Sequence, residues 1–318
     1  MIYAVWFPLL VPLLAVPIAR YTVSRLAPRA AAWILVSSAV LLACSSAAAL
    51  GALTALGFLR LGPVAALADF SPQQLGGHTA LALWTAPLAM ALLATGTALA
   101  IRMVVRHHRQ VRCEQRVIDP AAGELTVRPD EYPYAYALPG RRGNPGYIVV
   151  SAAMLRSLSP DEREALFAHE RAHLAGRHHL FLGAAQVAAT LNPVLRGLRE
   201  PLTYALERWA DEAAAHAVGD RRLAARAIGR AALAAHRSKS PAARRGAILA
   251  ATGGAVPRRV KALVHADDTA GRGRVDCWRL IAAAALPCAL AASGAGAADA
   301  VEDLHLNVQI AQKRAGSR

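Results

Sequence analysis

Long apolar stretches constrain the fold of this chain more than any other feature of its sequence. A helix needs roughly 20 apolar residues to cross the hydrocarbon core of a bilayer, which is about 30 Å thick. Four stretches approach or exceed that length, at residues 1–19, within 30–59, at 79–101 and at 280–298. The composition agrees, because 55% of the residues are hydrophobic and only 18% are charged, against about 25% charged in soluble domains. The sequence therefore predicts a polytopic membrane protein with about four transmembrane helices.

Arginine residues beside these stretches indicate the orientation, because basic loops are retained on the cytoplasmic side. Residues 20–29 contain three arginines and no acidic residue, and residues 102–116 contain five arginines. No basic residue precedes the first apolar stretch, which argues against a cleaved signal peptide. An excess of arginine and alanine is typical of a GC-rich bacterial genome. We therefore expect a multi-pass protein of the bacterial plasma membrane, with the N-terminus outside and the segment after residue 101 inside.

The predicted organisation has four parts. Residues 1–101 form three transmembrane helices with short loops, and residues 102–276 form a cytoplasmic domain. Residues 277–298 form the fourth transmembrane helix, and residues 299–318 form a short extracytoplasmic tail. The four cysteines include no CxxC pair, which argues against a disulfide framework or a cysteine metal site.

The cytoplasmic segment contains the motif HExxH at residues 169–173. Residues 159–162, Ser-Pro-Asp-Glu, form a capping box that predicts a helix beginning at Pro160. On that helix His169 and His173 are four residues apart and share a face, as two zinc ligands require. Glu170 stands beside them, where it can take a proton from an activated water molecule. The alternative is a pair of surface histidines on a solvated helix.

A third ligand for the same metal ion is available further along the chain. Glu207 and Asp211 form an ExxxD motif 34 residues beyond His173, and they share one face of a helix. Glu207 can complete a His₂Glu site, the ligand set of catalytic zinc. Asp211 can then accept the free ring N–H of a ligating histidine. The alternative is a charged, solvated helix face. We expect one Zn²⁺ per chain.

These motifs resemble those of integral-membrane zinc peptidases, in particular the BlaR/MecR-type peptidases of metallopeptidase family 56. Residues 136–140 and 147–151 are similar to the two strands ahead of the active helix in that family. Residues 159–179 are similar to the active helix itself, and residues 207–214 to the helix that carries the third ligand. The resemblance implies a mostly α-helical membrane protein with a cytoplasmic, gluzincin-like α+β zinc peptidase domain.

The resemblance also implies the role of each site residue. His169, His173 and Glu207 would bind zinc, Glu170 would be the general base, and Asp211 would orient a ligand. Substrate would add to an edge strand of the sheet. That strand would consist of Tyr147, Ile148, Val149 and Val150.

The function implied by the family is regulatory proteolysis of a protein substrate, such as a BlaI/MecI-type transcriptional repressor. The antibiotic-sensing members carry a large penicillin-binding domain after the last span, where about twenty residues remain here, so β-lactam sensing is not predicted. One alternative is a housekeeping quality-control protease of the HtpX or prenyl-protease type. The other is a non-catalytic membrane scaffold that retains the zinc fold.

Several further features have both a functional and a structural interpretation. His178 and His179 either bind a second metal ion or mark a helix junction, and we favour the junction. His216 either stabilises an oxyanion or is an ordinary half-buried histidine. Residues 180–191 are apolar but too short to span a bilayer, so we expect a buried or membrane-apposed helix there.

The chain has a formal net charge of +15, and residues 221–261 contain eleven basic residues and no acidic one. No nucleic-acid-binding motif accompanies this charge, so we expect no nucleic-acid partner. Attraction to the anionic inner leaflet of the bilayer explains it better. Within this stretch, residues 256–263 resemble a helix found in relatives of the family, which favours a structural role for them.

Overall fold

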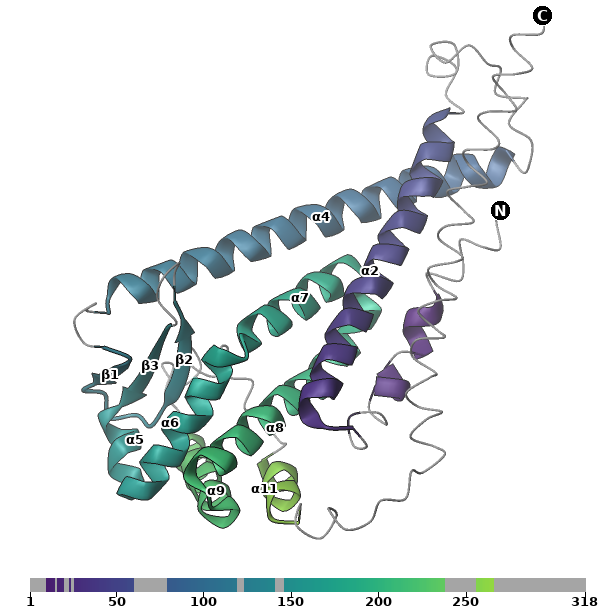
Figure 1. The fold of residues 1–318 in the computed structure, drawn as a ribbon. Helices are drawn as coiled ribbons and strands as arrows, with labels where there is room; N and C mark the ends of the chain where they lie inside the picture. The colour runs from purple at the N-terminus through teal and green to yellow at the C-terminus, as the bar shows by residue number, and fades with distance from the viewer. Residues whose placement is uncertain are drawn as a thin grey trace, which may run out of the picture.

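The computed structural model describes residues 26–59, 79–118, 123–140, 146–237 and 256–265, with a few residues between 10 and 23. Two long helices, α2 (Pro28–Leu59) and α4 (Thr79–Arg116), pack against each other where α2 ends and α4 begins, and then diverge (Figure 1). Most of the other described helices lie on the side of α2 where the two helices diverge (Figure 1). A small sheet lies at the far end of α4.

Two segments, Pro28–Ala55 and Thr85–Arg116, are long and apolar enough to cross a membrane. They correspond to the second and third predicted spans. The fourth predicted span and the tail lie outside the described residues, and only part of the first span is described. Leu88, Leu92 and Ile101 on α4 are each more than half exposed, as expected of side chains that face lipid.

Helix α4 is longer than the span predicted from it. The apolar stretch ends at Ile101, whereas the helix continues to Arg116. The added residues are rich in arginine, a good helix former, and contain no proline or glycine that would end the helix. The polar continuation carries the chain from the end of the span to the sheet (Figure 1).

The sheet has three strands, β1 (Leu125–Arg128), β2 (Ala135–Pro139) and β3 (Gly146–Ser151). Their order is β1-β3-β2, with β1 parallel and β2 antiparallel to β3. The prediction that residues 147–150 form an edge strand is therefore wrong. These residues lie on the central strand, because β1, a strand that the sequence analysis did not identify, pairs along its second side. Within the described residues, the open edges belong to β1 and β2.

The remaining helices form the body of the domain. They are α5 (Ala152–Ser157), α6 (Pro160–Ala175), α7 (His178–Leu191), the 3₁₀ helix η3 (Pro193–Leu198), α8 (Arg199–Val218), α9 (Arg221–Arg237) and α11 (Val256–Val264). The predicted capping box is present at the start of α6, where Ser159 and Glu162 each accept a backbone N–H from the other. The helix that carries HExxH thus begins at the predicted residue, Pro160.

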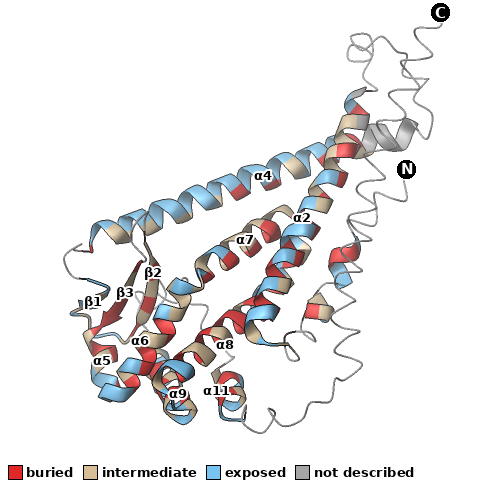
Figure 2. Ribbon diagram, viewed as in Figure 1, coloured by how far each residue is buried: buried red, intermediate tan, exposed pale blue. Residues whose placement is uncertain are grey.

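Helix α7 lies along α2 and α4, and at 14 residues it is not among the described helices long enough to cross a membrane. Buried side chains of α2, α7, η3 and α8 form one hydrophobic cluster, which includes Leu35, Phe181 and Leu206. Within it Asn192 Nδ2 donates a hydrogen bond to Ser46 Oγ at 3.0 Å. Figure 2 shows the buried residues on the side of α2 that faces this body, while α4 is largely exposed. The prediction of a buried or membrane-apposed helix over residues 180–191 is confirmed.

Candidate metal centre

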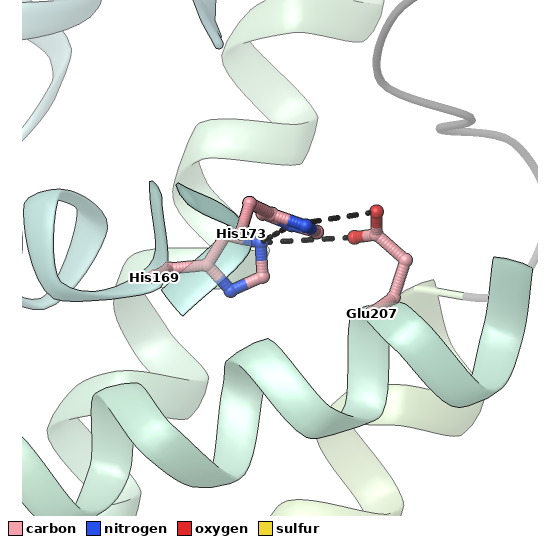
Figure 3. Close-up of side chains that lie close together, drawn as sticks. All are labelled: His169, His173 and Glu207. Atoms are coloured by element: carbon pink, nitrogen blue, oxygen red, sulfur yellow. Dashed lines mark hydrogen bonds and ion pairs between the residues drawn. The ribbon is translucent and has the colours of Figure 1, made fainter. Parts of the chain in front are cut away.

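The three predicted ligands converge on one point. His169 and His173 project from α6 and Glu207 from α8, and one ligand atom from each lies within 4.8 Å of the others (Figure 3). The two histidine Nε2 atoms are 3.1 Å apart. Nε2 of His169 is 3.7 Å from Oε2 of Glu207, and Nε2 of His173 is 3.7 Å from Oε1. The spacing of the two motifs therefore corresponds to a real cluster in space.

The chemistry of this donor set fits a zinc ion. Two imidazole nitrogens and one carboxylate are ligands that zinc accepts, and catalytic zinc sites commonly have three protein ligands. His169 and Glu207 are both buried, so the carboxylate and the imidazoles face one another with little solvent between them. Burial lowers the pKa of His173 to about 4, which keeps its imidazole neutral, the form that binds a metal ion.

Asp211 lies where the ExxxD motif predicts. It follows Glu207 by one turn of α8, and its Oδ1 is 3.1 Å from Nδ1 of His169. Burial tends to lower the pKa of His169, but the carboxylates of Asp211 and Glu207 outweigh it and raise the pKa to about 10. Metal binding at this histidine must therefore displace a proton. The same contact orients the ring so that Nε2 faces the other ligands.

Arg259, which the sequence analysis did not identify as a site residue, completes the charge balance. Its side chain is buried, and Nη1 lies 2.7 Å from Oε2 of Glu207. Nε and Nη2 donate to the two oxygens of Asp211 at 2.8 and 2.6 Å. Burial tends to raise the pKa of Glu207, but Arg259 and His169 hold that pKa well below its ordinary value. Residues 256–263 were predicted as a structural helix, and nothing in their local pattern singles out Arg259.

Glu170 is buried next to the cluster. Its carboxylate accepts a hydrogen bond from the backbone N–H of Ala137 in β2, and burial raises its pKa to about 7. A general base works best when its pKa lies near the operating pH. Glu170 thus combines the position and the proton affinity that a general base needs.

The three further histidines considered in the sequence analysis, His178, His179 and His216, differ in their burial. His178 is buried with its Nδ1 2.7 Å from Nδ1 of His173, whereas His179 is only partly buried. His216 is exposed on α8, so the structure does not support the predicted oxyanion role. Among the described residues, the cluster of ligand atoms contains none of the three.

An HExxH helix packed against a second helix that supplies an acidic ligand defines a metallopeptidase, a hydrolase that acts on peptide bonds. Residues 119–198 match the sequence model of peptidase family M48. His169, Glu170 and His173 lie within the match, and Glu207 lies beyond its end. The match does not single out the BlaR/MecR type. No curated protein and no solved structure matches the chain.

Proposed function

We propose that this protein is a membrane-bound zinc metalloendopeptidase that cleaves a specific protein substrate at the cytoplasmic face of the bacterial plasma membrane. The observation that carries the peptidase function is the convergence of His169, His173 and Glu207 beside a buried Glu170. The resemblance to BlaR/MecR-type peptidases supports a regulatory role. A BlaI/MecI-type transcriptional repressor is the proposed substrate.

Each site residue has a role in peptide hydrolysis. His169, His173 and Glu207 hold the zinc ion, which when bound polarises the peptide carbonyl and activates water. Glu170 accepts the proton of that water and passes it to the leaving amine. Asp211 keeps the ring of His169 in its ligating orientation. Arg259 neutralises the two buried carboxylates of α8.

The proposed path of the substrate follows β2. The backbone of Tyr134 faces β3, since its carbonyl accepts the N–H of Ser151. Alternate residues of a strand present their backbone groups to opposite sides, so Ala135 and Ala137 point toward the open edge. Because the N–H of Ala137 bonds to Glu170, an extended peptide added to this edge would lie against the catalytic base.

The proposed topology keeps the segments of the sequence analysis. Helices α2 and α4 cross the membrane, residues 102–276 form the cytoplasmic peptidase domain, and residues 277–298 form a further span before the tail at 299–318. Arg29, at the expected cytoplasmic end of α2, lies over the ring of Trp209 on α8, two residues after Glu207. This contact supports an active site close to the inner membrane surface, where basic residues also favour an anionic leaflet.

A second candidate is membrane-protein quality control by a protease of the HtpX or prenyl-protease type. Two observations favour it: the match to peptidase family M48, which does not indicate the BlaR/MecR type, and the packing of α8, which carries Glu207, against the apolar helix α2. The presence of Glu170 and all three ligands argues against the non-catalytic scaffold, which has no need of a general base.

The test compares new protein N-termini, identified by mass spectrometry, in cells that express the wild type or Glu170→Gln at equal levels. Fragments of one soluble repressor found only with the wild type support regulatory proteolysis. Fragments of many membrane proteins support quality control. His216→Gln is the matched control, because His216 is exposed, and it should give the wild-type pattern. Identical patterns for the wild type and Glu170→Gln would contradict the proposed activity.

A further inference from the structure

The turn that joins α6 to α7 has an unusual backbone. Only Gly176 and Arg177 separate the two helices, and Arg177 adopts a left-handed conformation with φ 50° and ψ 42°. It is the one non-glycine residue with positive φ in the described part of the chain. Such a conformation is unfavourable for an L-residue, so the surrounding structure must favour it. Its consequence is that His178 turns back toward the last turn of α6.

His178 contacts the side of His173 that faces away from the metal centre. The two Nδ1 atoms are 2.7 Å apart, while Nε2 of His173 faces His169 and Glu207. His178 is 2% exposed. In the described part of the chain its Nε2 has no hydrogen-bond partner, so its hydrogen bond within those residues is the one to His173.

The ring of His178 fits tightly between two neighbours. A Cβ atom at Gly176 would lie 2.5 Å from Nε2 of His178, so a side chain at that position would displace the ring. On another side the ring of Trp209 lies 4.6 Å away, measured between centroids. Gly176 and Trp209 thus restrict the orientation of the His178 ring.

The protonation of the pair follows from the chemistry of imidazole. A neutral histidine that binds a metal ion through Nε2 carries its proton on Nδ1. For His173 that proton points at Nδ1 of His178, which must then be the acceptor. Partners of this kind fix the tautomer and the ring orientation of a metal ligand.

The same residues reach the membrane helix α2. The guanidinium carbon of Arg29 lies 5.3 Å from the centroid of the Trp209 ring, within the range of a cation–π contact. One turn further along α2, Trp33 packs edge-on against Phe181 of α7 at 4.7 Å. Phe181 in turn lies 6.1 Å from Trp209. Two successive turns of α2 therefore contact the residues that enclose His178.

We propose that His178 is a positioning residue that orients the ligand His173 through the Nδ1–Nδ1 hydrogen bond. Trp209, which contacts both the His178 ring and Arg29, couples the position of His178 to that of α2. The proposal rests on the zinc site of the proposed function. It gives α2 a direct route to the metal centre, because a shift of α2 against α8 moves Trp209 and with it the ring of His178. Zinc affinity is then a property that a signal received in the membrane can change.

The first experiment measures zinc affinity by competition with a chromophoric chelator, using the full chain in detergent after metal removal. His178→Leu should bind zinc roughly 10- to 100-fold more weakly, the range found when the partner of a ligand is removed. His178→Asn should retain most of the affinity, since its Oδ1 can accept in place of Nδ1. His179→Leu, at the neighbouring and less buried histidine, is the matched control and should equal the wild type. Circular dichroism confirms that each variant is folded.

Each outcome of this comparison decides a different question. Wild-type affinity in His178→Leu, or a loss in His178→Asn as large as in His178→Leu, would overturn the positioning role while leaving the zinc site intact. A wild-type protein that binds no zinc would instead contradict the proposed function. The two failures are therefore distinguishable.

The link to α2 needs a double-variant comparison. Arg29→Met should weaken zinc binding by roughly threefold. Removal of a positive charge would by itself strengthen the binding of a cation such as Zn²⁺. A weaker zinc affinity in Arg29→Met would therefore report the lost contact with Trp209. If Arg29 acts through His178, Arg29→Met combined with His178→Leu should bind zinc no more weakly than His178→Leu alone. Fully additive losses, or no loss in Arg29→Met, would refute the link.

Discussion

Arg259 lies with its Nη1 2.7 Å from Oε2 of Glu207, so a residue near the end of the described chain contacts the third ligand of the metal centre. The same guanidinium pairs with both oxygens of Asp211. Two buried carboxylates one helical turn apart repel each other, and the positive guanidinium between them offsets this electrostatic repulsion. Helix α11 thereby fixes the part of α8 that supplies the acidic ligand.

Arg259→Leu should destabilise the protein by about 3 kcal/mol, because removal of one partner of a buried ion pair leaves the others uncompensated. Arg259→Lys should be intermediate, since it keeps the charge but loses the paired geometry. Thermal unfolding of the full chain in detergent measures both. Lys261→Leu is the control at an exposed basic residue of the same helix, and equal effects at 261 and 259 would contradict the argument.

Metal removal should lower the unfolding temperature of the wild type and leave that of a ligand variant unchanged. A ligand that binds only the folded state stabilises it in proportion to the logarithm of its concentration. We expect added Zn²⁺ to reverse the effect of a chelator in the wild type and to have no effect in Glu207→Ala. A chelator-induced shift of equal size in Glu207→Ala would show that the metal binds elsewhere.

Ala135→Pro should lower kcat/KM for a peptide substrate by roughly tenfold while the fold persists, because it removes an outward-facing hydrogen-bond donor of the open edge of β2. Val127→Pro is the matched control on the opposite edge. In β1 the carbonyl of Glu124 accepts from Ile148, so by alternation the N–H of Val127 points outward. Steady-state kinetics on both variants decide the matter. Equal losses at the two edges would show that β2 has no special role in substrate binding.

Glu162 should make stability depend on pH. Burial tends to raise its pKa, but the N–H of Ser159 and the guanidinium of Arg230 outweigh it and hold the pKa below its ordinary value of 4.5. Because the pKa is lower in the folded state, Glu162 contributes stability above pH 4.5, and this is lost as the pH falls through the folded pKa. Glu162→Gln should cost about 1 kcal/mol at pH 7 and progressively less in acid.

The measurement for Glu162 is the difference in unfolding temperature between the wild type and the variant across that pH range. Glu164→Gln is the control, since Glu164 is exposed on the same helix. A difference that stays constant into acid would mean that the ionised carboxylate of Glu162 is not what stabilises the start of α6.

Local patterns predicted the parts of the structure that local interactions determine. The capping box placed the start of α6, and the four-residue spacing placed His169 and His173 on one face of it. The apolar stretches at 30–59 and 79–101 appear as α2 and α4. Each of these predictions depends on residues a few positions apart, whose relation is fixed once the helix forms.

The relations between distant segments were not predictable in the same way. Residues 147–150 have the composition of a strand whether they lie at the edge or in the centre, and the pairing of β1 with β3 decides which. The sequence predicts a helix junction at His178, and α7 does begin there, but the contact of His178 with His173 depends on the left-handed turn at Arg177.

Composition and spacing along single helices predicted the two long apolar helices, the HExxH helix with His169 and His173 on one face, and Glu207 as a candidate third ligand. The packing of distant segments places Glu207 beside the two histidines, makes β1 and β2 the outer strands, and brings Arg259 to Glu207 and Asp211. A buried charge is stable only beside its partner, and here that partner comes from a helix 48 residues beyond Asp211. The chain brings the two together only when it folds.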